Sequence, residues 1–238
     1  MAPGQCTAAE ILANRHGSPA YARFMQNLGR VIKIRDELEV YTGGLQADKH
    51  GDYALAWWDD IGQILFHVAT FMPNLETPGQ SSVFHKKAEI GNIHVKIVWN
   101  DSGKPFQRET IVGAFNHINI VIEPHTLTTE AVHYQDNYHT HGYFKVLLQV
   151  DPSLPRITSI GEFKLVSMQD LARTVRNYAL IACLFCTSWL DTGEDGPVTI
   201  PINTNWQERL KLINRSERLL SKEPEMDYSL YGLPVSMS

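Results

Sequence analysis

Residues 85–103 pass from a polar, helix-like segment into an apolar strand with only the pair Gly91-Asn92 at the junction. A chain that joins a helix to a strand this abruptly must pack the two kinds of element together. The junction fixes the backbone of Asn92 on both sides while leaving its side chain free to project outward. Taken alone, the pair is also typical of a helix C-terminus, because Gly and Asn tolerate the left-handed conformation that ends many helices.

The composition restricts the class of protein. The chain has 238 residues, of which 43% are hydrophobic, which suits one domain with a sizeable core. The net charge of −5 and the lack of Lys/Arg runs argue against nucleic-acid binding. The longest apolar stretch, residues 178–185, is far shorter than the roughly 20 residues that cross a bilayer. Three cysteines imply no disulfide framework, so we expect a soluble, cytoplasmic protein without a transmembrane segment.

Helical patterns lie near both ends of the chain, and strand patterns lie between them. Ser18 is placed to cap a helix that starts with Pro19, and Asp59-Asp60 is placed to start another that Pro73 ends. The expected helices are residues 8–15, 19–28, 59–72, 82–90, 171–190 and 206–220, and the expected strands are 31–34, 53–57, 95–99, 110–112, 118–122 and 144–150. The helix over 82–90 is too polar to face a core.

This mixture predicts an α/β fold: a single layered domain with a central mixed β-sheet flanked by helices. We expect the domain to span residues 8–221 and the tail over residues 222–238 to be disordered.

Histidines gather in an irregular segment, where His133, His139 and His141 lie close to Asp136. A zinc site needs four ordered ligands, or three with a supporting shell, so this spacing favours an ordinary surface loop. A metal-dependent hydrolase built on the loop is a further alternative. The chain has neither a Gly-rich phosphate-binding loop nor a Gly-x-Ser-x-Gly nucleophile. We therefore expect no metal and no cofactor.

Several short motifs follow one another in a distinctive order. They are Gly17-Ser18, Leu28-Gly29-Arg30, Tyr41-Thr42-Gly43-Gly44, Trp58-Asp59-Asp60-Ile61, Met72-Pro73, Ile90-Gly91-Asn92 and Asn100-Asp101-Ser102-Gly103. In this order they resemble the Rap-type GTPase-activating (Rap-GAP) domain family, and within it the tuberin-like domains. The resemblance covers about residues 8–215.

The resemblance implies a fold like a GTPase core that binds no nucleotide, and an activity supplied in trans. Asn92 matches the asparagine "thumb" that family members insert into the nucleotide pocket of a small GTPase to position the attacking water. A carboxamide suits this task, because phosphoryl transfer depends mainly on orientation and charge stabilisation. The neighbouring residues expected to contact the GTPase are His85, Lys86, Lys87 and Glu89.

The segment before the thumb departs from the family pattern. Ala88, Glu89 and Ile93 stand where the family usually has Arg, His and Asp. A carboxylate near a triphosphate is repulsive unless it points away, so we expect a changed supporting arrangement or a reduced activity.

The tuberin-like motifs also imply partners. The expected substrate is a GTP-loaded, Rheb-like GTPase, with Rap as the related alternative, and a hamartin-like partner would bind through a longer parent chain. Peripheral attachment to endomembranes would then come through partners. The alternative function is a binding or dimerisation module of the same fold that stimulates no hydrolysis.

Overall fold

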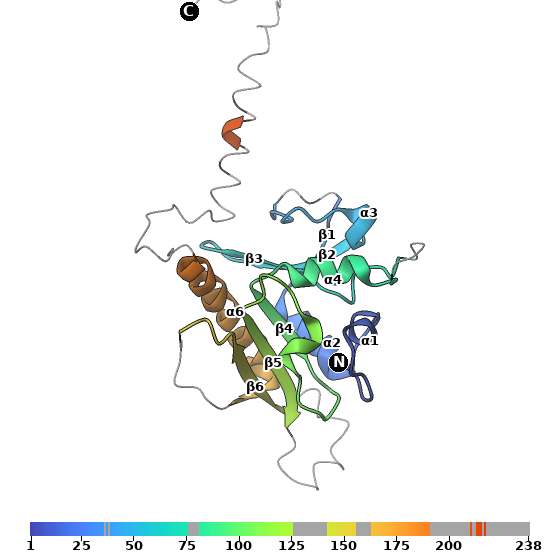
Figure 1. Ribbon diagram of the computed structural model, residues 1–238. Helices are drawn as coiled ribbons and strands as arrows, with labels where there is room; N and C mark the ends of the chain where they lie inside the picture. Colours follow the sequence, from blue (N-terminus) through green and yellow to red (C-terminus); the bar gives the residue numbers. More distant parts are fainter. Residues whose placement is uncertain are drawn as a thin grey trace, which may run out of the picture. The chain divides into compact units, whose positions relative to one another are not determined.

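The computed structural model describes residues 1–35, 37, 39–75, 81–125, 142–155, 163–190, 210, 213–215 and 217. The chain divides into two compact units, residues 1–198 and 199–238, and the elements below all belong to the first (Figure 1). The expected helix over 206–220 and the expected tail fall almost wholly outside the described residues, as does the histidine-rich loop. Every helix among the described residues is too short or too polar to cross a lipid bilayer.

The described residues of the first unit form two sheets rather than one. The strands β1 (Arg30–Lys33), β2 (Tyr53–Trp58) and β3 (Gln63–Phe66) form an antiparallel sheet in that order. A mixed sheet has the order β4-β5-β6-β7, in which β4 (Val95–Trp99) runs parallel to β5 (Ile118–His125). The strands β6 (Tyr143–Val150) and β7 (Lys164–Ser167) continue it antiparallel. The predicted α/β class with a mixed sheet is confirmed.

Helices cover both faces of the mixed sheet. On one face, α2 (Pro19–Leu28) and α6 (Met168–Leu190) bury Ile118, Ile120 and Ile122 of β5. On the other face, Val121 packs with α1 (Ala8–Leu12), α4 (Phe84–Gly91) and the short helix η1 (Arg108–Ile111). This division follows from the strand period of two, which sends successive side chains to opposite faces. A third cluster of buried hydrophobic side chains packs on the three-stranded sheet, beside α3 (Ala47–His50).

Both predicted N-terminal helices form, although the first ends at Leu12, three residues before its predicted end. The helix α2 has the predicted bounds, and the hydroxyl of its N-cap Ser18 accepts a hydrogen bond from the backbone N–H of Tyr21 at 3.2 Å. The helix α1 begins with a capping box formed by Thr7 and Glu10.

The helix predicted over 59–72 is wrong, because this segment forms the β2–β3 hairpin. The carboxylate of Asp59 accepts hydrogen bonds from the N–H groups of Ile61 at 2.9 Å and Gly62 at 2.8 Å, which closes a turn instead of starting a helix. The apolar spacing after the turn suits a strand as well as a helix. Pairing with β2, in which Ile64 lies opposite Trp57, makes residues 63–66 a strand. His67 therefore follows a strand and does not lie in a helix.

Two smaller predictions are also wrong, and neither α3 nor β7 is predicted from the sequence. Residues 110–112 fall at the end of η1 instead of forming a strand. The pair Gly91-Asn92 ends α4 without the left-handed conformation, since neither residue has a positive φ. Asn92 has φ −95° and ψ 15°, and its N–H donates to the carbonyl of Glu89 at 3.3 Å. The helix-to-strand junction itself is confirmed.

Candidate functional site

Asn92 is exposed at the C-terminus of α4, immediately before β4. Figure 1 shows α4 running between the two sheets, so a regular element holds the backbone on each side of this residue. A side chain in this position is free to reach a partner. The requirement that residue 92 lie outside the protein's own core is met.

A shallow hollow of about 350 Å³ surrounds Asn92, and we call its lining the Asn92 face. The face combines exposed apolar side chains with one charged side chain, that of Lys87. Phe84 and Val112 are 55% and 64% exposed and line the same hollow, so they present adjacent apolar surface to solvent. The lining residues are Phe84, Lys87, Ala88, Gly91, Asn92, Val112 and Gly113. An apolar surface with an outward amide and one cation suits a protein partner.

The loop over residues 112–117 forms one side of the Asn92 face through Val112 and Gly113, a position that was not predicted from the sequence. Arg108 fixes the end of this loop by donating to the carbonyls of Asn116 at 2.9 Å and His117 at 3.3 Å. The same guanidinium pairs with the carboxylate of Asp151 at the end of β6. The buried Lys96 donates to the carbonyl of Ile111 at the start of the loop.

Two glycines bring the loop against α4. A Cβ added to Gly113 would lie 2.1 Å from the carbonyl oxygen of Gly91, closer than any real contact. A Cβ added to Gly91 would lie 3.4 Å from Gly113, which is an ordinary contact. The absence of a side chain at Gly113 therefore allows the loop to approach the last turn of α4, directly beside Asn92.

Lys86 does not lie where the sequence interpretation put it. Its side chain is fully buried, and its ammonium donates to the carbonyl of Leu12 in α1 at 3.0 Å. Burial, reinforced by the positive charge of Arg15, lowers the pKa of Lys86 to about 8. Together with Val83 and Ile90, it fixes α4 on the mixed sheet, so the expectation that this helix is too polar to face a core is also wrong.

The other predicted contact residues take three different positions. Lys87 is exposed and lines the Asn92 face. His85 is partly buried at the start of α4, where burial lowers its pKa and its Nε2 has no hydrogen-bond partner. The carboxylate of Glu89 turns away from the Asn92 face, toward His50 and His67. Glu89 is therefore not among the residues that line the Asn92 face.

The histidine environment predicts an acid-sensitive fold. Burial is the main cause that lowers the pKa of His67, His85 and His117 below 6.5, although Glu89 opposes the shift at His67. A lowered histidine pKa in the folded state means that protonation favours the unfolded state. The contribution of these neutral histidines to the free energy of unfolding is therefore complete above pH 6.5 and declines as the pH falls below it. We expect the free energy of unfolding in urea to be lower at about pH 5.5 than at about pH 7.5.

The carboxylates with a lowered pKa do not complicate that comparison: the pKa of Glu10 is lowered from 4.5 and those of Asp59 and Asp151 from 3.8, so all three stay ionised at both pH values. Replacing the half-buried His67 with Gln should weaken the dependence, whereas replacing the exposed His16 with Gln should not. Equal stability of the unaltered chain at the two pH values would contradict the prediction.

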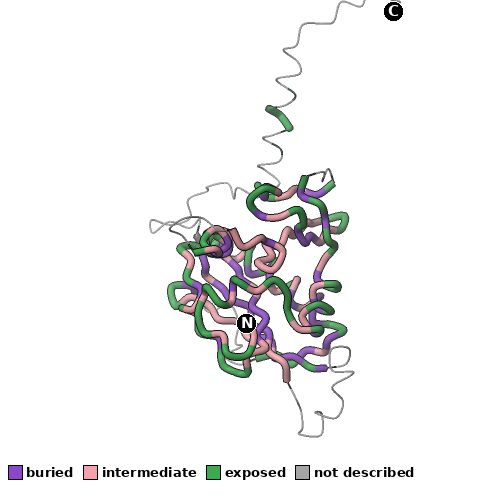
Figure 2. Tube along the Cα trace, turned by 90° about the vertical axis from the view of Figure 1, so that its right-hand side faces the viewer, coloured by how far each residue is buried: buried purple, intermediate pink, exposed green. Residues whose placement is uncertain are grey.

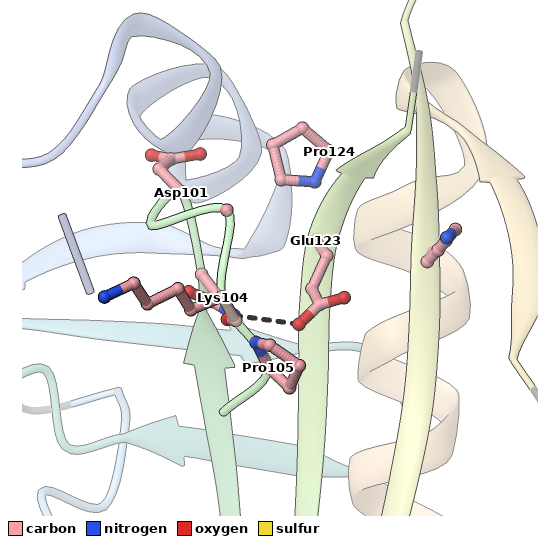
Figure 3. Close-up of a pocket in the computed structure, with 8 residues that line it drawn as sticks. Asp101, Lys104, Pro105, Glu123 and Pro124 are labelled. Carbon is pink, nitrogen blue, oxygen red and sulfur yellow. Dashed lines mark hydrogen bonds between the residues drawn. The ribbon is translucent and has the colours of Figure 1, made fainter. Parts of the chain in front are cut away.

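A second hollow, of about 320 Å³, lies beyond the other end of β4 (Figure 3). Here the amide of Asn100 donates to the carboxylate of Glu123 at 2.8 Å and to the carbonyl of Lys104 at 2.7 Å, while its oxygen accepts from Ser102. Asn100 thus organises the turn of the Asn-Asp-Ser-Gly motif. Its polar atoms are used within the chain, so this hollow gives no sign of a ligand.

No group of metal-ligating side chains occurs within the described part of the chain. The loop with His133, His139 and His141 lies outside it, so the metal alternative has no structural test here.

Comparison with known proteins gives consistent results. The sequence model of the Rap/ran-GAP family matches residues 11–215. The tuberous sclerosis 2 protein homolog of Schizosaccharomyces pombe is 32% identical over 227 residues, which cover 93% of this chain and 16% of that protein. The Ral GTPase-activating protein subunit alpha-2 of Mus musculus is 33% identical over 52% of this chain and 6% of its own length. The chain therefore spans a small part of these curated relatives.

Among solved structures, the TSC2 GAP domain resembles this fold with a TM-score of 0.68 and 36% sequence identity. The match covers 80% of this chain and 95% of that domain. These findings confirm the predicted resemblance and its tuberin-like character.

Proposed function

Since this chain belongs to the Rap/ran-GAP family, we propose that it stimulates GTP hydrolysis by a small GTPase and that Asn92 enters the partner's nucleotide pocket. The observation that carries the proposal is the exposure of Asn92 at the end of a helix fixed on two sides. Its carboxamide can accept a hydrogen bond from water and donate one to a phosphate oxygen. Orientation of the attacking water is what this reaction needs most.

The Asn92 face supports this mode of action. Phe84 and Val112 offer apolar contact area around the amide, and Lys87 adds a positive charge for an acidic surface or a phosphate. On this proposal the GTPase covers the face and excludes bulk solvent from the hydrolysis site, apart from the attacking water. Hydrogen bonds to the transferring phosphate are stronger in such a site than in water.

We propose a Rheb-like GTPase as the substrate, on the strength of the tuberin-like resemblance, with Rap and Ral as the alternatives. A hamartin-like partner and a cytoplasmic activity attached peripherally to endomembranes belong to the same proposal. The test is phosphate release from GTP-loaded Rheb, Rap and Ral with a small amount of the chain, under multiple turnover. Stimulated release on one of the three supports the proposal, whereas binding without stimulation would favour the non-catalytic module.

Lys87 provides a prediction about binding. Lys87→Ala should weaken GTPase binding by roughly 1.5-fold to fivefold, because an exposed charge at an interface edge contributes about 0.2–1 kcal/mol. Lys87→Glu should weaken it further, and both effects should shrink at high salt. The maximal hydrolysis rate should change little. Binding is measured by titration with GTPase bound to a non-hydrolysable GTP analogue.

Lys104 provides the matched control, because it is equally exposed but lies beyond the other end of β4. Lys104→Ala should bind as the unaltered chain does. A Lys87→Glu variant with unchanged affinity would show that the Asn92 face is not the contact surface.

A further inference from the structure

Glu89 connects the helix that carries Asn92 to the other sheet of the molecule. Its Oε1 lies 3.2 Å from Nε2 of His50, the last residue of α3, and its Oε2 lies 3.7 Å from Nδ1 of His67, just after β3. Both histidines belong to the side of the unit formed by the three-stranded sheet. The carboxylate is one-third exposed, so its contacts are only partly screened by water.

The hydrogen bonds of His50 fix its orientation toward Glu89. The backbone N–H of Gln46 donates to Nδ1 of His50 at 2.8 Å, so this nitrogen carries the lone pair and Nε2 carries the proton. A neutral His50 can therefore donate from Nε2 to the Glu89 carboxylate. Because the ring is only 9% exposed and its Nδ1 accepts the Gln46 N–H, Nε2 faces the Glu89 carboxylate in a defined direction.

The backbone of Glu89 contacts Asn92 directly. Its carbonyl accepts the N–H of Asn92 at 3.3 Å in the last turn of α4. A shift of Glu89 would therefore move or release the backbone of the asparagine. One turn earlier, Lys86 is bonded to the carbonyl of Leu12 in α1, so α4 is fixed to α1 as well as to the three-stranded sheet.

We infer that Glu89 is a positioning residue for Asn92, acting through the close contacts of its carboxylate with His50 and His67 and through its carbonyl. This inference rests on the proposed function. It assigns to Glu89 a role different from the GTPase contact expected from the sequence: the side chain holds the helix from within and does not touch the partner. It also explains how this chain accommodates a carboxylate beside the thumb.

The test compares Glu89→Ala with Glu89→Gln. The glutamine keeps an oxygen that can accept the proton of His50, whereas alanine removes the contact. We expect Glu89→Ala to lower the maximal stimulated rate by about tenfold or more, since small displacements of a reacting group are costly. Affinity for the GTPase should stay within about twofold, and Glu89→Gln should recover most of the rate. His50→Ala should resemble Glu89→Ala, and the double variant should lose no more than either single variant.

Hydrogen exchange of the Asn92 amide is a second readout that does not depend on activity. Glu89→Ala should speed this exchange, and Glu89→Gln should leave it close to that of the unaltered chain. Asp60→Ala, which removes an exposed carboxylate from the β2–β3 turn, should change neither the rate nor the exchange.

The possible failures are distinguishable. If no GTPase is stimulated by the unaltered chain, the proposed function fails, and the exchange data alone then judge the role of Glu89. If Glu89→Ala matches the unaltered chain in exchange, or if Glu89→Gln is as defective as Glu89→Ala, the positioning role is overturned.

Discussion

Replacing Asn92 with alanine should lower the stimulated rate of GTP hydrolysis by about 100- to 1,000-fold, the usual cost of removing one hydrogen-bonding group aimed at a transition state. The fold should be unaffected, because the side chain is exposed and surface substitutions usually change stability by less than about 0.5 kcal/mol. The measurement is single-turnover phosphate release at saturating amounts of the variant, together with thermal unfolding.

The matched control is Asn27→Ala. Asn27 is also exposed and its amide donates only to Arg23 within α2, far along the chain from the Asn92 face. This variant should stimulate hydrolysis as the unaltered chain does. Full activity of Asn92→Ala would contradict the proposed mechanism, whatever the affinity of the complex.

Gly113→Ala should damage both stability and activity. Its Cβ would lie 2.1 Å from the carbonyl oxygen and 2.5 Å from the Cα of Gly91, and these are backbone atoms that cannot rotate away. The loop or the end of α4 must move, which we expect to cost about 1–3 kcal/mol of the free energy of unfolding. The stimulated rate should fall at least about tenfold, because the displaced turn carries Asn92.

Gly91→Ala offers a comparison at the same contact from the other side. Its added Cβ would meet Gly113 at 3.4 Å and the carbonyl of Val112 at 3.5 Å, both acceptable distances. Alanine also favours the helix by up to about 1 kcal/mol. We expect unchanged or slightly higher stability in urea unfolding and a rate within about threefold. Similar losses for the two variants would mean that the loop does not depend on the close approach at Gly113.

The sequence predicted well those elements whose signals are local. The N-cap Ser18 with Pro19 defined α2, and the Gly91-Asn92 pair located the junction between α4 and β4. Both signals act within a few residues: Ser18 caps the helix through its own side chain, and the Gly91-Asn92 pair marks the place where the polar helical pattern ends and the apolar strand pattern begins. The family resemblance rested on the same short motifs, and it identified Asn92 without any knowledge of its surroundings.

Contacts between distant segments were missed. The segment after Asp59 suited a helix by spacing, but pairing with β2 made it a strand. Lys86 looked like an exposed residue of a polar helix. Its burial is compensated by a hydrogen bond to the carbonyl of Leu12, which lies 74 residues away in the sequence. Figure 2 shows that buried, half-buried and exposed residues alternate along the described parts of the chain.

By itself, then, the amino-acid order determined the α/β class, the place of Asn92 between a helix and a strand, and the kind of family to which the chain is similar. Only the tertiary structure decided what surrounds Asn92. It buries Lys86 against α1, directs the carboxylate of Glu89 toward His50, and brings the loop at Gly113 against the end of α4. The physical reason is that caps and turns depend on neighbours in sequence, whereas burial, ion pairs and close backbone contacts depend on residues that folding alone brings together.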